Sequence, residues 1–138
     1  MNLARTRTQT HKQDLAPVFT VRAGVIRDYS AGKNVVDLLE EIVRHPEDTF
    51  SVKVSGDSMI DAGIHDGDTL TVDRTLQPNS GTIIIASVDG EALVKRLKLR
   101  DGKTLLASEN KNYPPIDVTG FISFRILGVV TGLIRKIV

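Results

Sequence analysis

Cysteine and tryptophan are both absent from this chain of 138 residues, and aromatic residues make up only 4% of it. Without cysteine the chain can form no disulfide, no thiolate nucleophile and no cysteine-ligated zinc site, which fits a cytoplasmic protein. The histidines, His11, His45 and His65, lack the spacing of metal ligands. We therefore expect neither a metal nor another cofactor.

An excess of charge and a long apolar run are also missing. The 18 Lys and Arg residues nearly balance the 17 Asp and Glu residues, so we expect no direct sequence-specific DNA binding. The longest apolar stretch, near the C-terminus, is too short to span a bilayer and contains Arg135 and Lys136. The polar first residues lack the apolar region of a signal peptide. The sequence thus predicts no membrane segment and no export.

What remains predicts one mainly β domain that follows an extended arm. Residues 1–16 show little apolar periodicity, and residues 17–26, PVFTVRAGVI, are rich in β-branched residues typical of extended chain. Residues 34–48 place apolar side chains at helical spacing before Pro46 stops the pattern, which predicts one short helix. Too little chain precedes this helix for a helix-turn-helix module.

Beyond Phe50 the apolar period changes to two, which is typical of strands. Asp-Gly pairs at 66–67, 89–90 and 101–102 lie between alternating runs, where this dipeptide favours a tight hairpin turn. The predicted strands cover residues 50–54, 68–73, 81–88, 91–99, 103–108 and 125–137.

A lysine lies on the apolar side of one predicted strand. In residues 91–99, Lys95 shares a face with Leu93, Leu97 and Leu99, so we expect it to be buried. Desolvation lowers the pKa of a buried lysine, and a neutral amine can act as a general base. Ser58 lies where strand 50–54 breaks into an acidic, glycine-rich turn, and it would be the nucleophile of a Ser-Lys pair.

Both residues also have a structural interpretation. A lysine on an apolar face commonly extends its charged end to water at a sheet edge. A serine after Gly-Asp commonly caps a helix or forms a turn. The residue pattern therefore leaves open a β interaction module in which Ser58 and Lys95 are incidental.

Three segments together resemble the UmuD branch of the LexA-like self-cleaving serine peptidases. They are SGDSMIDAGIHDGDTLTVD at 55–73, GTIIIASVDGEALVKRL at 81–97 and FRILGVVTGLIRKI at 124–137. The resemblance implies a LexA- and signal-peptidase-like domain of hairpins and curled sheets. It also implies that Ser58 is the nucleophile and Lys95 the general base, with the backbone N–H groups of Asp57 and Ser58 at the oxyanion.

Members of this family cut their own chain at a bond between small residues, and Ala-Gly occurs here at 23–24, 31–32 and 62–63. Only Ala23-Gly24 lies in an extended segment, the pose in which a protease binds its substrate. We therefore predict an arm, residues 1–23, that is removed from a peptidase domain, residues 24–138. An alanine before the cut matches the repressors of the family, whereas the polymerase-subunit branch commonly has cysteine there.

The resemblance further implies a role in the SOS response to DNA damage. The expected partners are a second copy in a homodimer, a RecA–single-stranded-DNA filament as co-protease, and a UmuC-like Y-family polymerase subunit. The processed form would be the accessory subunit of this translesion polymerase V. The alternatives are the peptidase domain of a LexA-type repressor, which would need a helix-turn-helix, and a signal peptidase, which would need a membrane anchor.

Overall fold

The structure is a computed structural model that describes residues 35–138 and divides the chain into two compact units, residues 1–44 and 45–138. The described part of the first unit is helix α2, Val35–Ile42, which a 2.7 Å hydrogen bond from the Val43 N–H to the Leu39 carbonyl extends. The predicted short helix is thereby confirmed. The arm and the predicted Ala23-Gly24 cleavage site lie outside the described residues.

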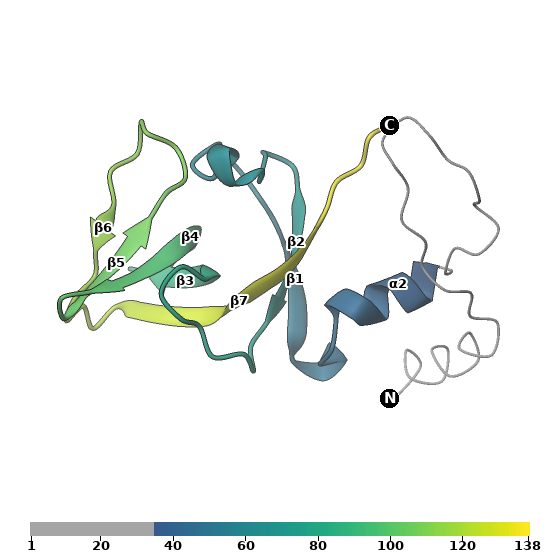
Figure 1. The fold of residues 1–138 in the computed structure, drawn as a ribbon, viewed down its shortest axis with the longest axis horizontal. Coiled ribbons are helices and arrows are strands. Elements are labelled where there is room, and N and C mark those ends of the chain that lie inside the picture. Colours follow the sequence, from purple (N-terminus) through teal and green to yellow (C-terminus); the bar gives the residue numbers. More distant parts are fainter. Residues whose placement is uncertain (1–34) are drawn as a thin grey trace. The chain divides into compact units, whose positions relative to one another are not determined.

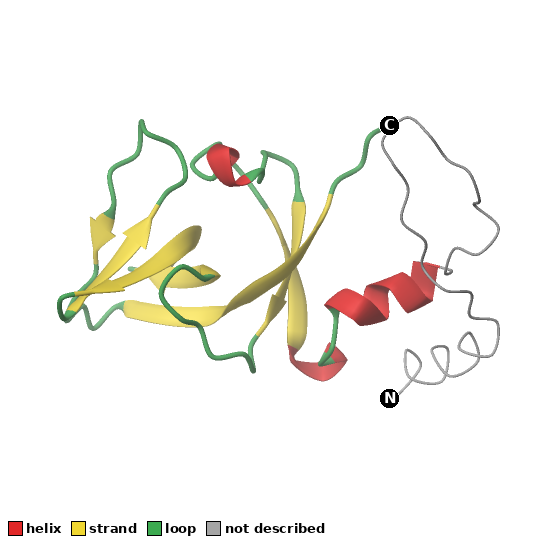
Figure 2. Ribbon diagram, viewed as in Figure 1, coloured by secondary structure: helices red, strands yellow, loops and turns green. Residues whose placement is uncertain are grey.

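The second unit is built on one antiparallel sheet of 7 strands in the order β1-β2-β7-β3-β4-β5-β6 (Figures 1 and 2). The strands are β1 Thr49–Lys53, β2 Thr69–Asp73, β3 Ile83–Val88, β4 Glu91–Arg100, β5 Lys103–Ala107, β6 Ile116–Asp117 and β7 Phe124–Ile134. Single 3-10 turns lie at Pro46–Asp48 (η1) and Ile60–Ala62 (η2). The mainly β prediction is confirmed, although strand β6 has no counterpart in the sequence pattern. No helix among residues 35–138 is long and apolar enough to cross a membrane.

Two of the Asp-Gly pairs close tight hairpins. Asp89 and Gly90, with φ of 51° and 84°, join β3 to β4. Asp101 and Gly102, with φ of 52° and 75°, join β4 to β5. Positive φ at both central residues belongs to the type I′ turn, whose twist matches that of the flanking strands.

The third pair, Asp66-Gly67, does not close such a hairpin. Strands β1 and β2 do pair, but the whole of residues 54–68 connects them. Within this connection the Gly67 N–H donates a 2.8 Å hydrogen bond to the Val54 carbonyl, so the pair turns the chain back into β2. The long connection carries Ser58.

Strand β7 joins the two parts of the sheet. Residues 129–134 of β7 pair with β2, and residues 124–129 pair with β3. The register shifts once in each pairing, which leaves Thr131 and Leu127 as the extra residues of two bulges. Because bulges bend a strand and increase its twist, β7 curls the sheet along its length (Figure 1).

Gly128 of β7 lies against the end of β2. A Cβ atom at this position would lie 2.6 Å from Cγ1 of Val72 and 3.0 Å from the carbonyl oxygen of Asp73. A side chain at this position would force the Val72 side chain and the end of β2 to move, so glycine allows the close approach of the two strands.

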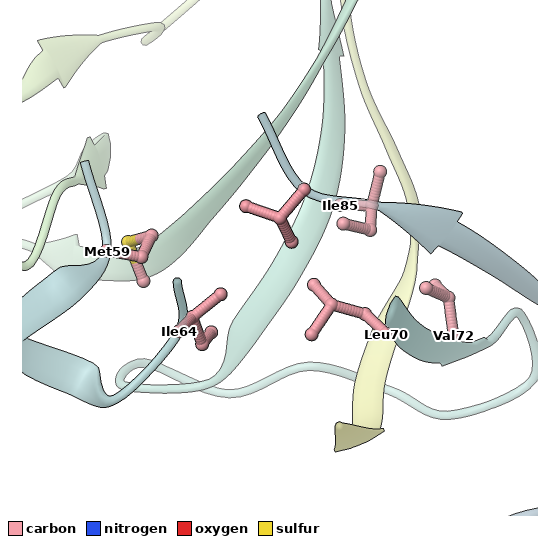
Figure 3. Packing of buried hydrophobic residues seen from close by; sticks show 6 residues of the cluster. Met59, Ile64, Leu70, Val72 and Ile85 are labelled. Carbon is pink, nitrogen blue, oxygen red and sulfur yellow. The ribbon is translucent and has the colours of Figure 1, made fainter. Parts of the chain in front are cut away.

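Two clusters of apolar side chains form the core of the sheet domain. Neighbouring residues of β3 divide between the clusters, because successive side chains of a strand point to opposite faces. One cluster contains Val54, Met59, Ile64, Leu70, Val72 and Ile85 (Figure 3). The other contains Ile84, Ala86, Leu97, Leu106, Val118 and Val129.

Candidate active site

Ser58 lies in the turn that leads into η2, within the connection between β1 and β2. Before Ser58, the N–H of Gly56 donates a 2.8 Å hydrogen bond to Oδ1 of Asp66, which holds the turn. Gly56 has a φ of 94°. After Ser58, the side chain of Met59 is only 1% exposed and packs into the first core cluster (Figure 3). Ser58 itself is half-buried, and its backbone is held next to this buried residue at the edge of the core.

Lys95 is buried in the middle of β4. It is 7% exposed, lies opposite Ile84 of β3, and shares a face with Leu97, which is 2% exposed. Desolvation by this burial lowers the pKa of the Lys95 amine. The predicted burial is confirmed for these two residues and is wrong for Leu99, which is 50% exposed because it lies near the hairpin at the end of the strand.

Ser58 and Lys95 line the same cavity, which has a volume of about 210 Å³. Strand β1, at one edge of the sheet order, contributes Val52 and Lys53 to its wall. The apolar part of the lining comes from Val52, Val54, Ile85, Ala92, Leu93 and Val94. The cavity thus combines a hydroxyl, an amine and an apolar wall of small and branched side chains.

The loop after β5, residues 108–113, contacts both candidate catalytic residues. The Lys95 amine donates a 2.7 Å hydrogen bond to Oγ of Ser108. The N–H of Glu109 donates to the Ser58 carbonyl at 2.8 Å, and the N–H of Asp61 donates to the Glu109 carbonyl at 2.8 Å. We refer to residues 108–113 as the bracing loop.

The far end of the bracing loop holds Asp57. Tyr113 donates a 2.6 Å hydrogen bond from its hydroxyl to Oδ1 of Asp57, which raises the pKa of Tyr113. Nδ2 of Asn110 donates to the Asp57 carbonyl at 3.0 Å. Among residues 35–138, the hydrogen bonds recorded at Asp57 and Ser58 therefore engage their carbonyls and the Asp57 carboxylate rather than their N–H groups.

Arg135 fixes the other end of the connection that carries Ser58. Its Nε and Nη2 atoms donate to the two carboxylate oxygens of Asp68, each at 2.7 Å, and Nη2 also donates to the Gly63 carbonyl at 2.7 Å. Asp68 is only 1% exposed. The hydrogen bonds from Arg135 lower the pKa of Asp68 to about 2, although burial opposes the shift. Both ends of the connection are thus anchored to other parts of the fold.

The sequence interpretation brought Ser58 and Lys95 together but missed Ser108, Tyr113 and Arg135. A usable signal existed for Ser108, because the tight turn at 101–102 pairs Arg96 with Ala107 and so places Ser108 beside Lys95 at the next position. In the part of the chain that the structure describes, no group of three or more His, Cys, Asp and Glu side chains could hold a metal.

In a comparison with known proteins, residues 17–131 match the model of the Peptidase S24-like family. The chain is 40% identical to Protein SamA of Salmonella typhimurium (strain LT2) over 129 residues, which cover 90% of this chain and 88% of SamA. The family resemblance noted in the sequence is thereby confirmed. The matched residues include Ser58, Lys95 and the bracing loop.

Longer relatives match as well. The chain is 38% identical to the LexA repressor of Stenotrophomonas maltophilia (strain R551-3) over 115 residues, 83% of this chain and 54% of the repressor. It is 38% identical to the LexA repressor of Clostridium perfringens (strain 13) over 125 residues, 88% of this chain and 59% of the repressor. The chain therefore spans little more than half the length of these repressors.

Proposed function

The chain belongs to the Peptidase S24-like family, and on that basis we propose that it is a self-cleaving serine peptidase with Ser58 as nucleophile and Lys95 as general base. One observation carries this assignment: a serine on a fixed turn and a lysine that is 7% exposed line one cavity of about 210 Å³. Burial lowers the pKa of Lys95, so its amine is neutral at a lower pH than that of an exposed lysine.

The chemistry follows from these two groups. The neutral Lys95 amine takes the proton from the Ser58 hydroxyl, and the Oγ atom of Ser58 attacks the carbonyl carbon of Ala23. Backbone N–H groups of Asp57 and Ser58 stabilise the negative charge on the carbonyl oxygen. The bond to Gly24 breaks, and Lys95 returns the proton to the new amine. A water molecule, deprotonated by Lys95, then attacks the ester carbonyl carbon; the bond to the Ser58 oxygen breaks, Lys95 returns the proton to that oxygen, and Ala23 leaves as a carboxylic acid that ionises in water.

The cavity can accommodate a small apolar residue before the cut. Val52, Leu93 and Val94 are among its apolar lining residues, and the methyl group of Ala23 would occupy little of a 210 Å³ space. Strand β1 lies at the edge of the sheet order and contributes Val52 and Lys53 to the cavity. An extended segment such as residues 17–26 could pair with such an edge and bring its carbonyl to Ser58.

Intact mass spectrometry tests this function. Wild type and a Ser58→Ala variant are incubated over a pH series up to about 10, where lysine loses its proton. We expect wild type alone to yield a fragment that begins at Gly24, with a rate that rises with pH. A Lys95→Ala variant should stay intact like Ser58→Ala. The same fragment from the Ser58→Ala protein would contradict the assignment, because cleavage would then come from another source.

For the biological role, we infer a damage-response switch in which a RecA–single-stranded-DNA filament promotes the cut. The processed homodimer then joins a UmuC-like Y-family polymerase subunit. The resemblance in residues 55–73 and 81–97 supports this role, and the long match to SamA agrees with it. We expect residues 24–138 to co-purify with a Y-family polymerase subunit. The yield should be higher than with the full-length Ser58→Ala chain.

The matches to LexA repressors favour a second candidate, the peptidase domain of a repressor. The two candidates differ in what the cut does. Cleavage of a repressor lowers its affinity for operator DNA, whereas the accessory subunit gains affinity for a polymerase. Measuring both, with and without the RecA filament, separates the two roles.

A further inference from the structure

Ser108 is the hydrogen-bonding partner of the buried amine of Lys95. The distance from Nζ of Lys95 to Oγ of Ser108 is 2.7 Å, and the lysine is 7% exposed. The side chain of Lys95 has four rotatable bonds beyond Cα, so an amine without a partner could take several orientations. Ser108 removes part of this freedom at the atom that has to accept a proton.

The local fold gives Ser108 its place. Strands β4 and β5 pair Arg96 with Ala107, and Ser108 follows directly after the last residue of β5, beside Lys95. The next residue, Glu109, is tied to the Ser58 carbonyl by its N–H. It also forms an ion pair with Arg96 on β4. Ser108 therefore lies between Ala107, which pairs with β4, and Glu109, which is bound to Ser58 and Arg96.

The hydrogen-bonding capacity of an amine explains what this contact does. A neutral amine has two N–H donors and one lone pair, whereas an ammonium has three donors and no acceptor. When one N–H is occupied by Ser108, the lone pair is confined to directions away from Ser108. Two hydroxyls line the same space, that of the exposed Ser55 and that of the half-buried Ser58, and Ser58 is the one that lies between the anchored residues Asp57 and Met59.

We propose that Ser108 is a positioning residue of the peptidase: its hydroxyl accepts a hydrogen bond from Lys95 and so orients the lysine amine toward Ser58. The proposal rests on the function proposed above, in which Lys95 is the general base. Ser108 touches neither the substrate nor the reacting bond, and it acts only through Lys95.

Other charged and titratable groups surround this pair. The ring of Tyr113 lies 5.8 Å from Nζ of Lys95, and its hydroxyl is bonded to Asp57. Lys53 enters the cavity from β1, while Glu109 and Arg96 neutralise each other. Since a hydroxyl oxygen stabilises an ammonium more than a neutral amine, loss of the Ser108 hydroxyl should lower the pKa of Lys95 further.

Two properties of a Ser108→Ala variant should therefore change together. Its maximal rate of self-cleavage at high pH should fall about tenfold, the effect of losing one hydrogen bond of ordinary strength in the transition state. The midpoint of its pH–rate profile should also move to lower pH. A merely structural loss would reduce the amount of folded enzyme without moving the midpoint.

Matched variants separate these causes. Ser108→Thr keeps the hydroxyl and should restore both the midpoint and most of the rate. Ser80→Ala removes an exposed hydroxyl that accepts a 3.0 Å hydrogen bond from the Leu99 N–H elsewhere on β4, and it should leave both properties as in wild type. A Ser108→Ala profile with wild-type midpoint and rate would overturn the proposal.

A second measurement does not depend on cleavage. In an uncleavable Ser58→Ala protein with ¹³C-labelled lysine, the Lys95 side-chain signal, assigned with Lys95→Arg, reports the titration of the amine directly. Addition of Ser108→Ala should lower its midpoint, and an unchanged midpoint would overturn the role of Ser108. If wild type never cuts itself, the proposed function fails, yet this titration still decides whether Ser108 binds the amine.

Discussion

The N–H of Glu109 donates a 2.8 Å hydrogen bond to the carbonyl of Ser58, which joins two loops that lie far apart in the sequence. The residue before Glu109 binds the amine of Lys95, so the two proposed catalytic groups are held by neighbouring residues of one loop. A change in the bracing loop should therefore act on both groups at once, although neither is altered.

The contact between Tyr113 and Asp57 tests this idea. In a Tyr113→Phe variant the 2.6 Å hydrogen bond to Oδ1 of Asp57 is lost, while the ring beside Lys95 remains. Because the bond is exposed and other contacts hold the loop, we expect self-cleavage to slow by less than about tenfold. Mass spectrometry of timed samples measures the rate. A variant as inactive as Ser58→Ala would indicate that Tyr113 has a direct role in the reaction.

Lys95 should reduce the stability of the fold at neutral pH. Burial lowers its pKa from the ordinary 10.5, so between the two values the unfolded chain binds more protons than the folded one, and stability rises with pH there. A Lys95→Met variant avoids the desolvation and should unfold at a higher urea concentration than wild type at pH 7. The difference in urea midpoint should narrow as the pH rises through 10.5, because above this value lysine is neutral in both the folded and the unfolded state.

The matched control for this comparison is Lys98→Met, which removes a partly exposed positive charge from the same strand. Urea denaturation of wild type and both variants at several pH values gives the differences in urea midpoint. A Lys95→Met protein that is less stable than wild type at pH 7 would show that the amine gains more from its contacts than it loses by burial.

The ion pair of Arg135 with Asp68 should be important for stability and for resistance to acid. An Arg135→Ala variant leaves a carboxylate that is 1% exposed without its main partner, so its urea midpoint should fall well below that of wild type. A Lys136→Ala variant, which alters the exposed neighbour, should change little. Equal midpoints for the two variants would mean that water or another group replaces Arg135.

The lowered pKa of Asp68 also predicts how the stability of the fold changes in acid. The pKa of Asp68 is lowered from 3.8 to about 2, so its contribution to stability is complete above pH 3.8 and is lost as the pH falls toward 2. The Arg135→Ala protein should lose much less stability over this pH range, because Asp68 no longer has the Arg135 hydrogen bonds that lower its pKa. Circular dichroism of both proteins at pH 5 and through the acid range measures the difference.

A Gly128→Ala substitution should destabilise the sheet by about 1–3 kcal/mol, the usual effect of adding atoms to a packed core. The new methyl group would lie 2.6 Å from Cγ1 of Val72 and 3.0 Å from the Asp73 carbonyl oxygen. In a Val72→Ala background the first of these clashes disappears, so the same substitution should cost less there. Equal costs in both backgrounds would show that the strands separate freely.

Local sequence patterns were sufficient for much of this fold. Asp89-Gly90 and Asp101-Gly102 form the predicted turns because the dipeptide alone supplies the positive φ values of a type I′ hairpin. Asp66-Gly67 also turns the chain, yet it does not close a hairpin, because a dipeptide specifies a bend and not the strand that follows. The burial of Lys95 was readable from alternation within one strand.

The contacts that complete the candidate site depend on tertiary structure. Arg135 meets Asp68, and Tyr113 meets Asp57, only after several strands have paired, and no local pattern selects these partners. Ser108 is an intermediate case. Its place beside Lys95 follows from the strand register on the two sides of the turn at 101–102. Its hydrogen bond to Lys95, however, depends on the burial of the lysine.

The sequence distance between the turn at Ser58 and the bracing loop sets an order of events during protein synthesis. The segment with the predicted cut, residues 17–26, leaves the ribosome early, and the turn at Ser58 follows it. The Glu109 and Tyr113 contacts and the Asp68 anchor need residues up to 113 and 135. On the function proposed above, a growing chain carries the predicted substrate before it can complete the peptidase, and we expect this order to protect the chain from cutting itself during synthesis.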